Sequence, residues 1–282
     1  MKTAIALLRL ARVSNLPTVW SNVLGASVIA GGLGAWDLAT VIVAMSAFYT
    51  GGMMLNDAFD RDADAAERPE RPLPSGDFSP AAAWTLGFAL LGLGVALLAI
   101  FGLASAVAGL ALAAAILLYD AWHKGNPLSP VIMGACRALV YAGTALAAGA
   151  TLSPPVIGAA LALLLYVAGI TLAAKGSASR SASALWPAVL LTAPIVVALL
   201  QGQATTETIL ISAMAASGIA WAVAKLRSGT AAGREAAVGL MIALIAIMDA
   251  VVASAHGDVG MALVAGILFI LTLVLQRFIA GT

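Results

Sequence analysis

The sequence predicts an all-α fold, a polytopic transmembrane bundle of nine to ten helices with a cytoplasmic N-terminus. Of 282 residues, 62% are hydrophobic and only 10% are charged, whereas soluble domains have about a quarter of their residues charged. Apolar segments of about 17 to 25 residues, enough to cross a bilayer, recur from end to end. The formal net charge of +1 gives no reason to expect a nucleic-acid partner.

The predicted elements follow one another along the chain. Residues 1–14 predict an amphipathic segment lying at the interface, because Arg9 and Arg12 interrupt the apolar stretch that precedes them. The apolar spans that follow lie at 15–33, 38–56, 80–101, 103–119, 128–149, 154–174, 186–201, 207–225, 235–254 and 258–277. The seventh span is short, and Pro187 and Pro194 within it predict a kink or a re-entrant shape. We expect one transmembrane domain over residues 1–282.

The basic residues support this topology. If the N-terminus is cytoplasmic and every span crosses, thirteen of the fourteen Lys and Arg fall on the cytoplasmic side. These residues are Lys2, Arg9, Arg12, Arg61, Arg68, Arg71, Lys124, Lys175, Arg180, Lys225, Arg227, Arg234 and Arg277. The fourteenth, Arg137, lies inside a span. Such asymmetry follows the positive-inside rule, and we expect a multi-pass protein of a bacterial inner membrane with its functional loops in the cytoplasm.

An acidic run begins at the end of the second span, in the pattern Asn56-Asp57-x-x-Asp60-x-x-x-Asp64. On a helix these four side chains fall within a stripe of about 100°, whereas Asp62 lies at about 240°. Carboxylates on one stripe repel one another, so a cation is expected there. Oxygen ligands favour Mg²⁺, which takes one or two carboxylates and completes its shell with water and phosphate. A solvated polar loop is the alternative, but the one-sided spacing favours a site.

Two stretches carry a resemblance to a known family. Residues 56–64 read Asn-Asp-Ala-Phe-Asp-Arg-Asp-Ala-Asp, and residues 67–76 read Glu-Arg-Pro-Glu-Arg-Pro-Leu-Pro-Ser-Gly. This resembles the first signature of the UbiA superfamily of intramembrane prenyltransferases, an N-D-x-x-D-x-x-x-D run followed by an R-P-L-P-x-G-like tail. The helix layout over roughly residues 10–255 is similar as well. The resemblance implies transfer of a prenyl group from a prenyl diphosphate to an aromatic or lipid acceptor, with magnesium as the cofactor.

The resemblance also implies roles for individual residues. Metal and diphosphate would be held by Asn56, Asp57, Asp60 and Asp64, the three aspartates being the catalytic candidates. Arg68 and Arg71 are candidates for the outer diphosphate oxygens. Tyr119 and Lys124 match a position that faces the diphosphate in the family, although Lys124 is equally explained as a topological anchor.

One departure from the family concerns the sixth connection, where members usually carry a second Asp-rich motif. Residues 175–181 read Lys-Gly-Ser-Ala-Ser-Arg-Ser, without a carboxylate. In one interpretation, Lys175 and Arg180 supply positive charge where a second metal would otherwise sit, which gives a one-metal diphosphate site. Alternatively, the chain keeps a binding cavity without turnover, as a lipid or metabolite carrier or export component. In general character the chain is similar to an EboC-like subgroup associated with export of a natural-product precursor. The family usually has nine helices, so the span 258–277 is interpreted as an addition.

Polar residues inside the spans are further candidates. Arg137 lies about ten residues into a span, where a charge almost always faces the bundle interior. It could contact a diphosphate, or form a structural ion pair with Asp249. Asp249 and His256 are interpreted as interfacial, and Asn22 as a bridge between helices. A phosphatidyl-alcohol transferase is a third class, but the D-G-x-x-A-R start of those enzymes does not occur in the sequence.

Overall fold

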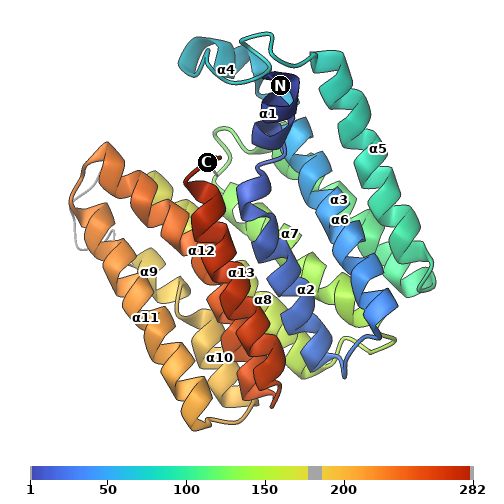
Figure 1. The fold of residues 1–282 in the computed structure, drawn as a ribbon, viewed down its shortest axis with the longest axis vertical. Helices are drawn as coiled ribbons and strands as arrows, with labels where there is room; N and C mark the ends of the chain where they lie inside the picture. The colour runs from blue at the N-terminus through green and yellow to red at the C-terminus, as the bar shows by residue number, and fades with distance from the viewer. Residues whose placement is uncertain (1, 177–185, 280–282) are drawn as a thin grey trace.

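The computed structural model describes residues 2–176 and 186–279, and this part of the chain is helical (Figure 1). The first half contains α1 (Lys2–Leu10), the 3-10 turn η1 (Val13–Asn15), α2 (Leu16–Ile29), α3 (Ala35–Phe59), α4 (Arg61–Glu67), α5 (Pro80–Ala99) and α6 (Leu103–Trp122). The second half contains α7 (Ser129–Ala147), α8 (Pro154–Gly176), α9 (Trp186–Leu190), α10 (Ala193–Gln201), α11 (Thr206–Arg227), α12 (Ala231–Ala255) and α13 (Val259–Gln276).

Each of the ten predicted spans corresponds to a helix or to a broken pair of helices. Eight helices of the described part are long and apolar enough to cross a membrane, namely α3, α5, α6, α7, α8, α11, α12 and α13. The predicted count of nine to ten is therefore slightly high for full-length crossings: α2 has 14 residues, and the seventh span is divided into α9 and α10. Pro194 lies in the first turn of α10, just after the break. Proline lacks an N–H and clashes with the carbonyl four residues earlier, so a continuous helix through this position is disfavoured.

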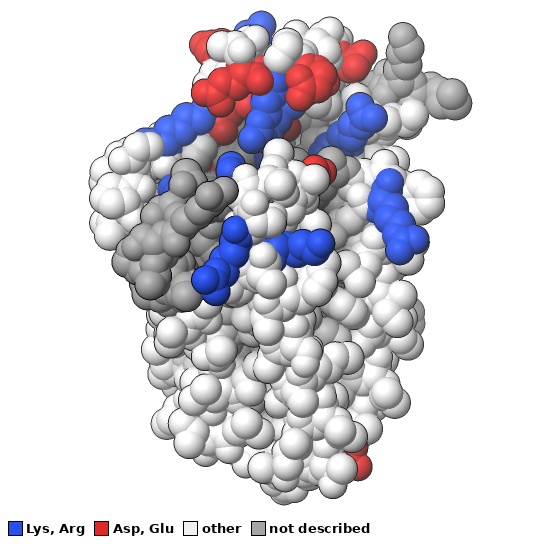
Figure 2. Space-filling model, turned by 90° about the vertical axis from the view of Figure 1, so that its left-hand side faces the viewer, with Lys and Arg blue, Asp and Glu red and all other residues white. Residues whose placement is uncertain are grey.

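The charged residues gather at one end of the bundle. Figure 1 places α1, α4 and both ends of the described chain at the same end of the long axis. In Figure 2 the Lys and Arg side chains of the visible face lie toward that end, and the opposite part of this face is almost uncharged. A charged end above a long uncharged surface fits a multi-pass integral membrane protein, since charged side chains are costly in hydrocarbon.

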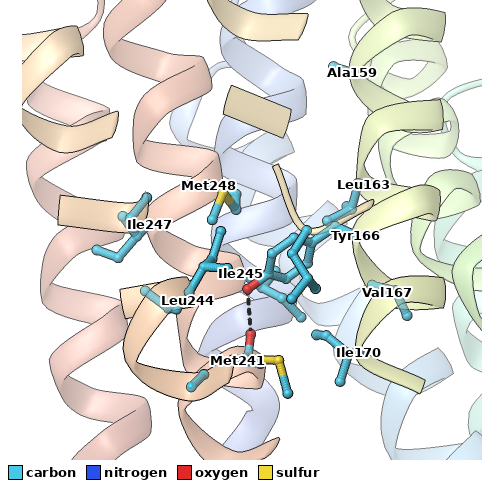
Figure 3. Close-up of a cluster of buried hydrophobic side chains, with 14 of the residues drawn as sticks. Ala159, Leu163, Tyr166, Val167, Ile170, Met241, Leu244, Ile245, Ile247 and Met248 are labelled. Atoms are coloured by element: carbon cyan, nitrogen blue, oxygen red, sulfur yellow. Dashed lines mark hydrogen bonds between the residues drawn. The ribbon is translucent and has the colours of Figure 1, made fainter. Parts of the chain in front are cut away.

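Two apolar cores hold the helices together. One is built around Met45 and Phe48 of α3, and the other lies among α7, α8, α11 and α12. Figure 3 shows the second core, where the Tyr166 hydroxyl donates a hydrogen bond of 2.8 Å to the backbone carbonyl of Met241. α12 is the most buried of the crossing helices, and α13 packs against α12 and α2.

A close contact between α3 and α5 fixes the helix that carries the acidic run. At Gly51 an added Cβ would lie 2.8 Å from the backbone carbonyl oxygen of Gly87 and 3.0 Å from Cβ of Leu90. Small residues let membrane helices approach closely, which is the main source of packing energy in lipid. α3 is therefore held against α5 one and a half turns before its polar end.

Candidate functional site

The acidic run forms the predicted one-sided stripe. α3 ends just before Asp60 and α4 begins just after it, yet the helical hydrogen bonds continue across the junction. The Asp60 amide donates to the carbonyl of Asn56 at 3.0 Å, and the Asp64 amide donates to the carbonyl of Asp60 at 2.8 Å. As a result, Asn56, Asp57, Asp60 and Asp64 are buried, whereas Asp62 is exposed on the other side.

Two arginines supply the cations expected along the stripe. Nη2 of Arg12 lies 3.1 Å from Oδ1 of Asp57 and 3.4 Å from Oδ1 of Asn56. Nη1 of Arg71 lies 2.7 Å from Oδ2 of Asp64 and 3.4 Å from the same oxygen of Asp57. Asp57 therefore shares one carboxylate oxygen between two guanidinium groups, so most of the stripe is already charge-balanced.

The third carboxylate of the stripe faces the end of α6. Oδ1 of Asp60 lies 2.7 Å from Nζ of Lys124, and its Oδ2 lies 3.3 Å from Nε2 of His123. Burial raises the pKa of Asp60, but the hydrogen bonds and charges of His123 and Lys124 outweigh burial and hold it below its usual value. The hydrogen bond to Asp60 in turn raises the pKa of His123, against the effect of its partial burial.

The loop after α4 positions Arg71. Pro69 disfavours a helical conformation at Arg68, whose φ is −144° and ψ is 62°, so α4 ends there. Leu73 is buried in a small apolar cluster with Leu10 and Met54, which anchors the loop beneath α1. Arg71 is thereby directed back onto the stripe, while Arg68 stays exposed.

Arg12 was not among the sequence candidates, because the sequence showed it only as a topological signal. Among the described residues it is the one non-glycine with a positive φ, at 43°. Such left-handed backbone is uncommon outside glycine and is often found at functional sites. The Tyr49 hydroxyl lies 3.5 Å from the backbone carbonyl of Arg12, so this residue contacts α3 through both its backbone and its side chain.

Side-chain contacts link the linings of two cavities: the Tyr49 hydroxyl of one contacts the carbonyl of Arg12 of the other, and Asn56 bonds to both Arg12 and Asp120. The polar cavity, about 940 Å³ of space open to solvent, is lined by Arg9, Arg12, Asp57, Arg68, Glu70, Arg71, Pro72 and Glu235. The apolar pocket, about 590 Å³ of space that also opens to solvent, is lined by Val19, Met45, Phe48, Tyr49, Gly52, Met53, Leu112, Ile116, Tyr119, Asp120, Met133, Cys136, Arg137 and Val140.

Asp120 is a second residue that sequence reasoning missed. It lies inside α6, is 4% exposed, and lines the apolar pocket. Its Oδ1 accepts a hydrogen bond of 3.2 Å from the Asn56 amide, whereas its Oδ2 has no hydrogen-bond partner among the described residues. The signal was present in the sequence, since an aspartate near the end of an apolar span is costly and usually functional.

Arg137 is held by a buried polar network. Nη1 of Arg137 donates to Oδ1 of Asn22 at 2.8 Å, and Nη2 donates to the Thr18 hydroxyl at 3.1 Å. The Asn22 amide donates to Asp249 at 2.8 Å, and so connects the two charges, which make no direct pair. Tyr141 also donates to Asp249, at 2.6 Å. The interpretation of Asp249 as interfacial was wrong: it is 1% exposed, because its partners on α2 and α7 enclose it.

The remaining candidates lie in different places. Tyr119 lines the apolar pocket and stacks on His123 with ring centroids 5.0 Å apart. Nζ of Lys175 donates a hydrogen bond of 2.7 Å to the Ser129 hydroxyl at the start of α7, a contact that does not join it to the acidic run. Arg180 lies outside the described residues.

In the part of the chain that the structure describes, no three carboxylate, imidazole or thiol side chains are gathered closely enough to hold a metal by themselves. The acidic stripe instead offers hard oxygen ligands that are spread along one wall. Magnesium usually takes one or two carboxylates and completes its shell with water and phosphate, so such a wall is suited to a metal that arrives with a phosphate-bearing ligand.

The fold and the site define a class: a multi-pass membrane protein with two cavities, one polar and one apolar. The polar cavity, lined by residues such as Arg12, Asp57 and Arg71, is called the charged mouth below. The model of the UbiA prenyltransferase family matches residues 15–245. The chain belongs to the UbiA prenyltransferase family.

Relatives and solved structures agree with this membership. A digeranylgeranylglyceryl phosphate synthase of Methanothrix thermoacetophila is 29% identical, over 59% of this chain and 62% of the relative, so less than two thirds of that relative is matched. The synthase of the same name from Halobacterium salinarum is 31% identical, over 79% of this chain and 80% of the relative. A UbiA homologue from Archaeoglobus fulgidus, solved with GPP and Mg²⁺, has a TM-score of 0.61 at 15% identity, covering 88% of this chain and 99% of that one. At 15% identity, the likeness to the Archaeoglobus fulgidus structure shows the fold alone.

Proposed function

We propose that this chain is a magnesium-dependent intramembrane prenyltransferase that moves a prenyl group from a prenyl diphosphate to an acceptor. The observation that carries the proposal is a polar cavity, rich in arginine and carboxylate, whose residue Arg12 is linked through Tyr49 and Asn56 to the lining of an apolar pocket. A prenyl diphosphate has the same division, with a multiply charged head on an apolar tail. Family membership and the named synthases support this assignment.

The donor would bind across the boundary between the two cavities. Its diphosphate would lie in the polar cavity, where Arg12, Arg68 and Arg71 supply guanidinium groups suited to phosphate oxygens. Its chain would enter the apolar pocket, whose wall is formed largely by aliphatic and aromatic side chains. The reacting carbon, which joins the head to the tail, would then lie near Asn56.

The stripe fits magnesium by its chemistry. Asn56, Asp57, Asp60 and Asp64 present amide and carboxylate oxygens along one buried wall, and these are the ligands that Mg²⁺ prefers. When bound, the metal neutralises charge on the leaving diphosphate. The homologue from Archaeoglobus fulgidus was solved with GPP and Mg²⁺, which supports the same pairing for this chain.

The chain's own residues would assist the departure of the diphosphate. As the bond between the reacting carbon and the diphosphate breaks, its electron pair leaves with the phosphate oxygen. Arg12, Arg71 and Lys124 are positioned along the stripe to stabilise that charge. The apolar pocket would exclude water from the allylic cation that remains.

The acceptor is proposed by analogy with the relatives. Their name, digeranylgeranylglyceryl phosphate synthase, favours a glyceryl phosphate lipid with a free hydroxyl over an aromatic ring. The same names do not favour the non-catalytic carrier. We further infer that the charged end faces the cytoplasm, since it carries nearly all of the basic residues. A bacterial inner membrane stays a prediction, and the named relatives are archaeal.

A pair of isosteric variants tests the metal and diphosphate assignment. We expect Asp64→Asn to lower magnesium-dependent affinity for geranylgeranyl diphosphate at least tenfold, because it removes a buried carboxylate from the stripe. Asp62→Asn is the matched control, since Asp62 belongs to the same run but is exposed on the opposite side. Binding is measured by calorimetry, and pyrophosphate release is measured with and without magnesium. Equal affinity in both variants would contradict the assignment.

A further inference from the structure

One oxygen of a residue that lines the apolar pocket has no protein partner among the described residues. Oδ2 of Asp120 is buried and makes no hydrogen bond within the described residues, although Oδ1 of the same carboxylate accepts one from Asn56. Asp120 is 4% exposed and lines the apolar pocket beside Tyr119. It is absent from the lining of the polar cavity, which contains Asp57 instead.

An unpartnered buried carboxylate oxygen is costly. Burial removes the water that would otherwise solvate it, and nothing in the described structure replaces that water. Such a group can persist at a binding site, because a bound ligand can supply the missing hydrogen-bond donor and so remove the cost of burial. Asp120 therefore points to a ligand that brings a polar hydrogen to the top of the apolar pocket.

The chemistry of the two proposed substrates indicates which one supplies that hydrogen. The diphosphate offers acceptor oxygens and negative charge, which a carboxylate repels. The prenyl chain is a hydrocarbon with no polar hydrogen. Of the reacting partners, only an acceptor with a hydroxyl can donate to Oδ2. Its oxygen must also come within about 3 to 3.5 Å of the reacting carbon, which the proposed donor pose places near Asn56, the hydrogen-bond partner of Asp120.

We propose that Asp120 recognises the hydroxyl of the acceptor and orients it toward the reacting carbon of the donor. This inference rests on the proposed function and deepens it, because it requires an alcohol as the acceptor. Asp120 thus has a different task from the acidic stripe: it selects the second substrate, whereas the stripe holds the head group of the first.

The test compares a hydroxyl-bearing probe with its deoxy analogue on the full-length protein. The probes are geranylgeranylglyceryl phosphate and the same molecule with its free hydroxyl replaced by hydrogen. We expect the wild-type protein to bind the alcohol about 10- to 100-fold more tightly, the range for a hydrogen bond to a charged group. In Asp120→Asn this preference should fall at least fivefold, while the affinity for the deoxy analogue stays within twofold. Absence of any preference in the wild-type protein overturns the inference.

The donor side separates this inference from the proposed function. Affinity for geranylgeranyl diphosphate with magnesium should fall much less in Asp120→Asn than in Asp64→Asn, because the asparagine keeps an oxygen that can accept from Asn56. If Asp120→Asn loses donor affinity as Asp64→Asn does, Asp120 serves the donor and the inference is overturned. If the wild-type protein binds no prenyl diphosphate, the proposed function fails. Asp62→Asn is the control for a change of charge alone.

Discussion

Arg12 illustrates what a single residue contributes to this site. Its guanidinium contacts both Asn56 and Asp57, and its backbone carbonyl lies against Tyr49 of the apolar pocket. The left-handed backbone at this position turns the chain from α1 into α2. Arg12 therefore lines the polar cavity and contacts Tyr49 in the lining of the apolar pocket.

We expect Arg12→Ala to weaken donor binding by about 10- to 100-fold, since it removes a charged hydrogen-bond donor from the mouth. Calorimetric titration with geranylgeranyl diphosphate and magnesium measures the change. Arg61→Ala is the control, because Arg61 begins α4 and is exposed. A similar loss in both variants would show that Arg12 acts only through the general charge of this end.

Two buried tyrosines allow a matched test of the polar network. The Tyr141 hydroxyl donates to the carboxylate of Asp249 at 2.6 Å, whereas the Tyr166 hydroxyl donates to a neutral carbonyl at 2.8 Å. Hydrogen bonds to charged groups contribute about 1.5–3 kcal/mol, and neutral ones about 0.5–1.5 kcal/mol.

Tyr141→Phe should therefore lower the free energy of unfolding more than Tyr166→Phe does. Denaturant titration in detergent measures the difference. Equal losses would indicate that Asp249 is neutral in the folded protein.

The sequence identified the acidic side of the site better than the basic side. Asn56, Asp57, Asp60 and Asp64 share one helical stripe, so helical geometry alone brought them together. Arg12 reaches Asp57 from 45 residues away, and helical periodicity carries no information about such a contact. The position of Asp120 near the end of an apolar span was readable from the sequence, but its hydrogen bond from Asn56 depends on the packing of α6 on α3.

At the scale of elements, the order and number of apolar segments were predictable and their exact lengths were not. A kink or re-entrant shape in the seventh span was expected from Pro187 and Pro194, and the structure has a break between α9 and α10 just before Pro194. The shortness of α2 was not, because the apolar sequence after residue 29 continues in a glycine-rich turn with positive φ at Gly31 and Gly32. Hydropathy does not distinguish an apolar turn from the last turn of a helix.

The contact between α3 and α5 gives a prediction at this scale. Gly51→Ala should destabilise the bundle by about 1–3 kcal/mol, because the new methyl group would overlap backbone atoms of α5 that cannot move aside. Gly92→Ala is the control: an added Cβ meets nothing within 4 Å, and alanine favours helix over glycine. Thermal unfolding in detergent measures both. An unchanged midpoint for Gly51→Ala would mean that the helices can separate without cost.

At the scale of the whole molecule, the distribution of charge predicts how the bundle sits in its membrane. A cysteine placed at Ser75, in the loop after α4, should react with a membrane-impermeant maleimide only from the cytoplasmic side. A cysteine at Gln203, in the connection after α10, should react only from the opposite side. Both positions are exposed. Labelling of both from one side would contradict the proposed orientation.

The ion pairs along the acidic stripe have a consequence for the order of binding. Asp57, Asp60 and Asp64 each form an ion pair with a basic side chain of the protein. Under the proposed function, Asp57, Asp60 and Asp64 would hold magnesium, and their present partners Arg12, Arg71 and Lys124 would then be free to bind the diphosphate. Binding of magnesium alone would leave the basic side chains without partners, and binding of diphosphate alone would leave the carboxylates without partners. Magnesium should therefore raise the affinity for diphosphate. By thermodynamic linkage, diphosphate then raises the affinity for magnesium by the same factor.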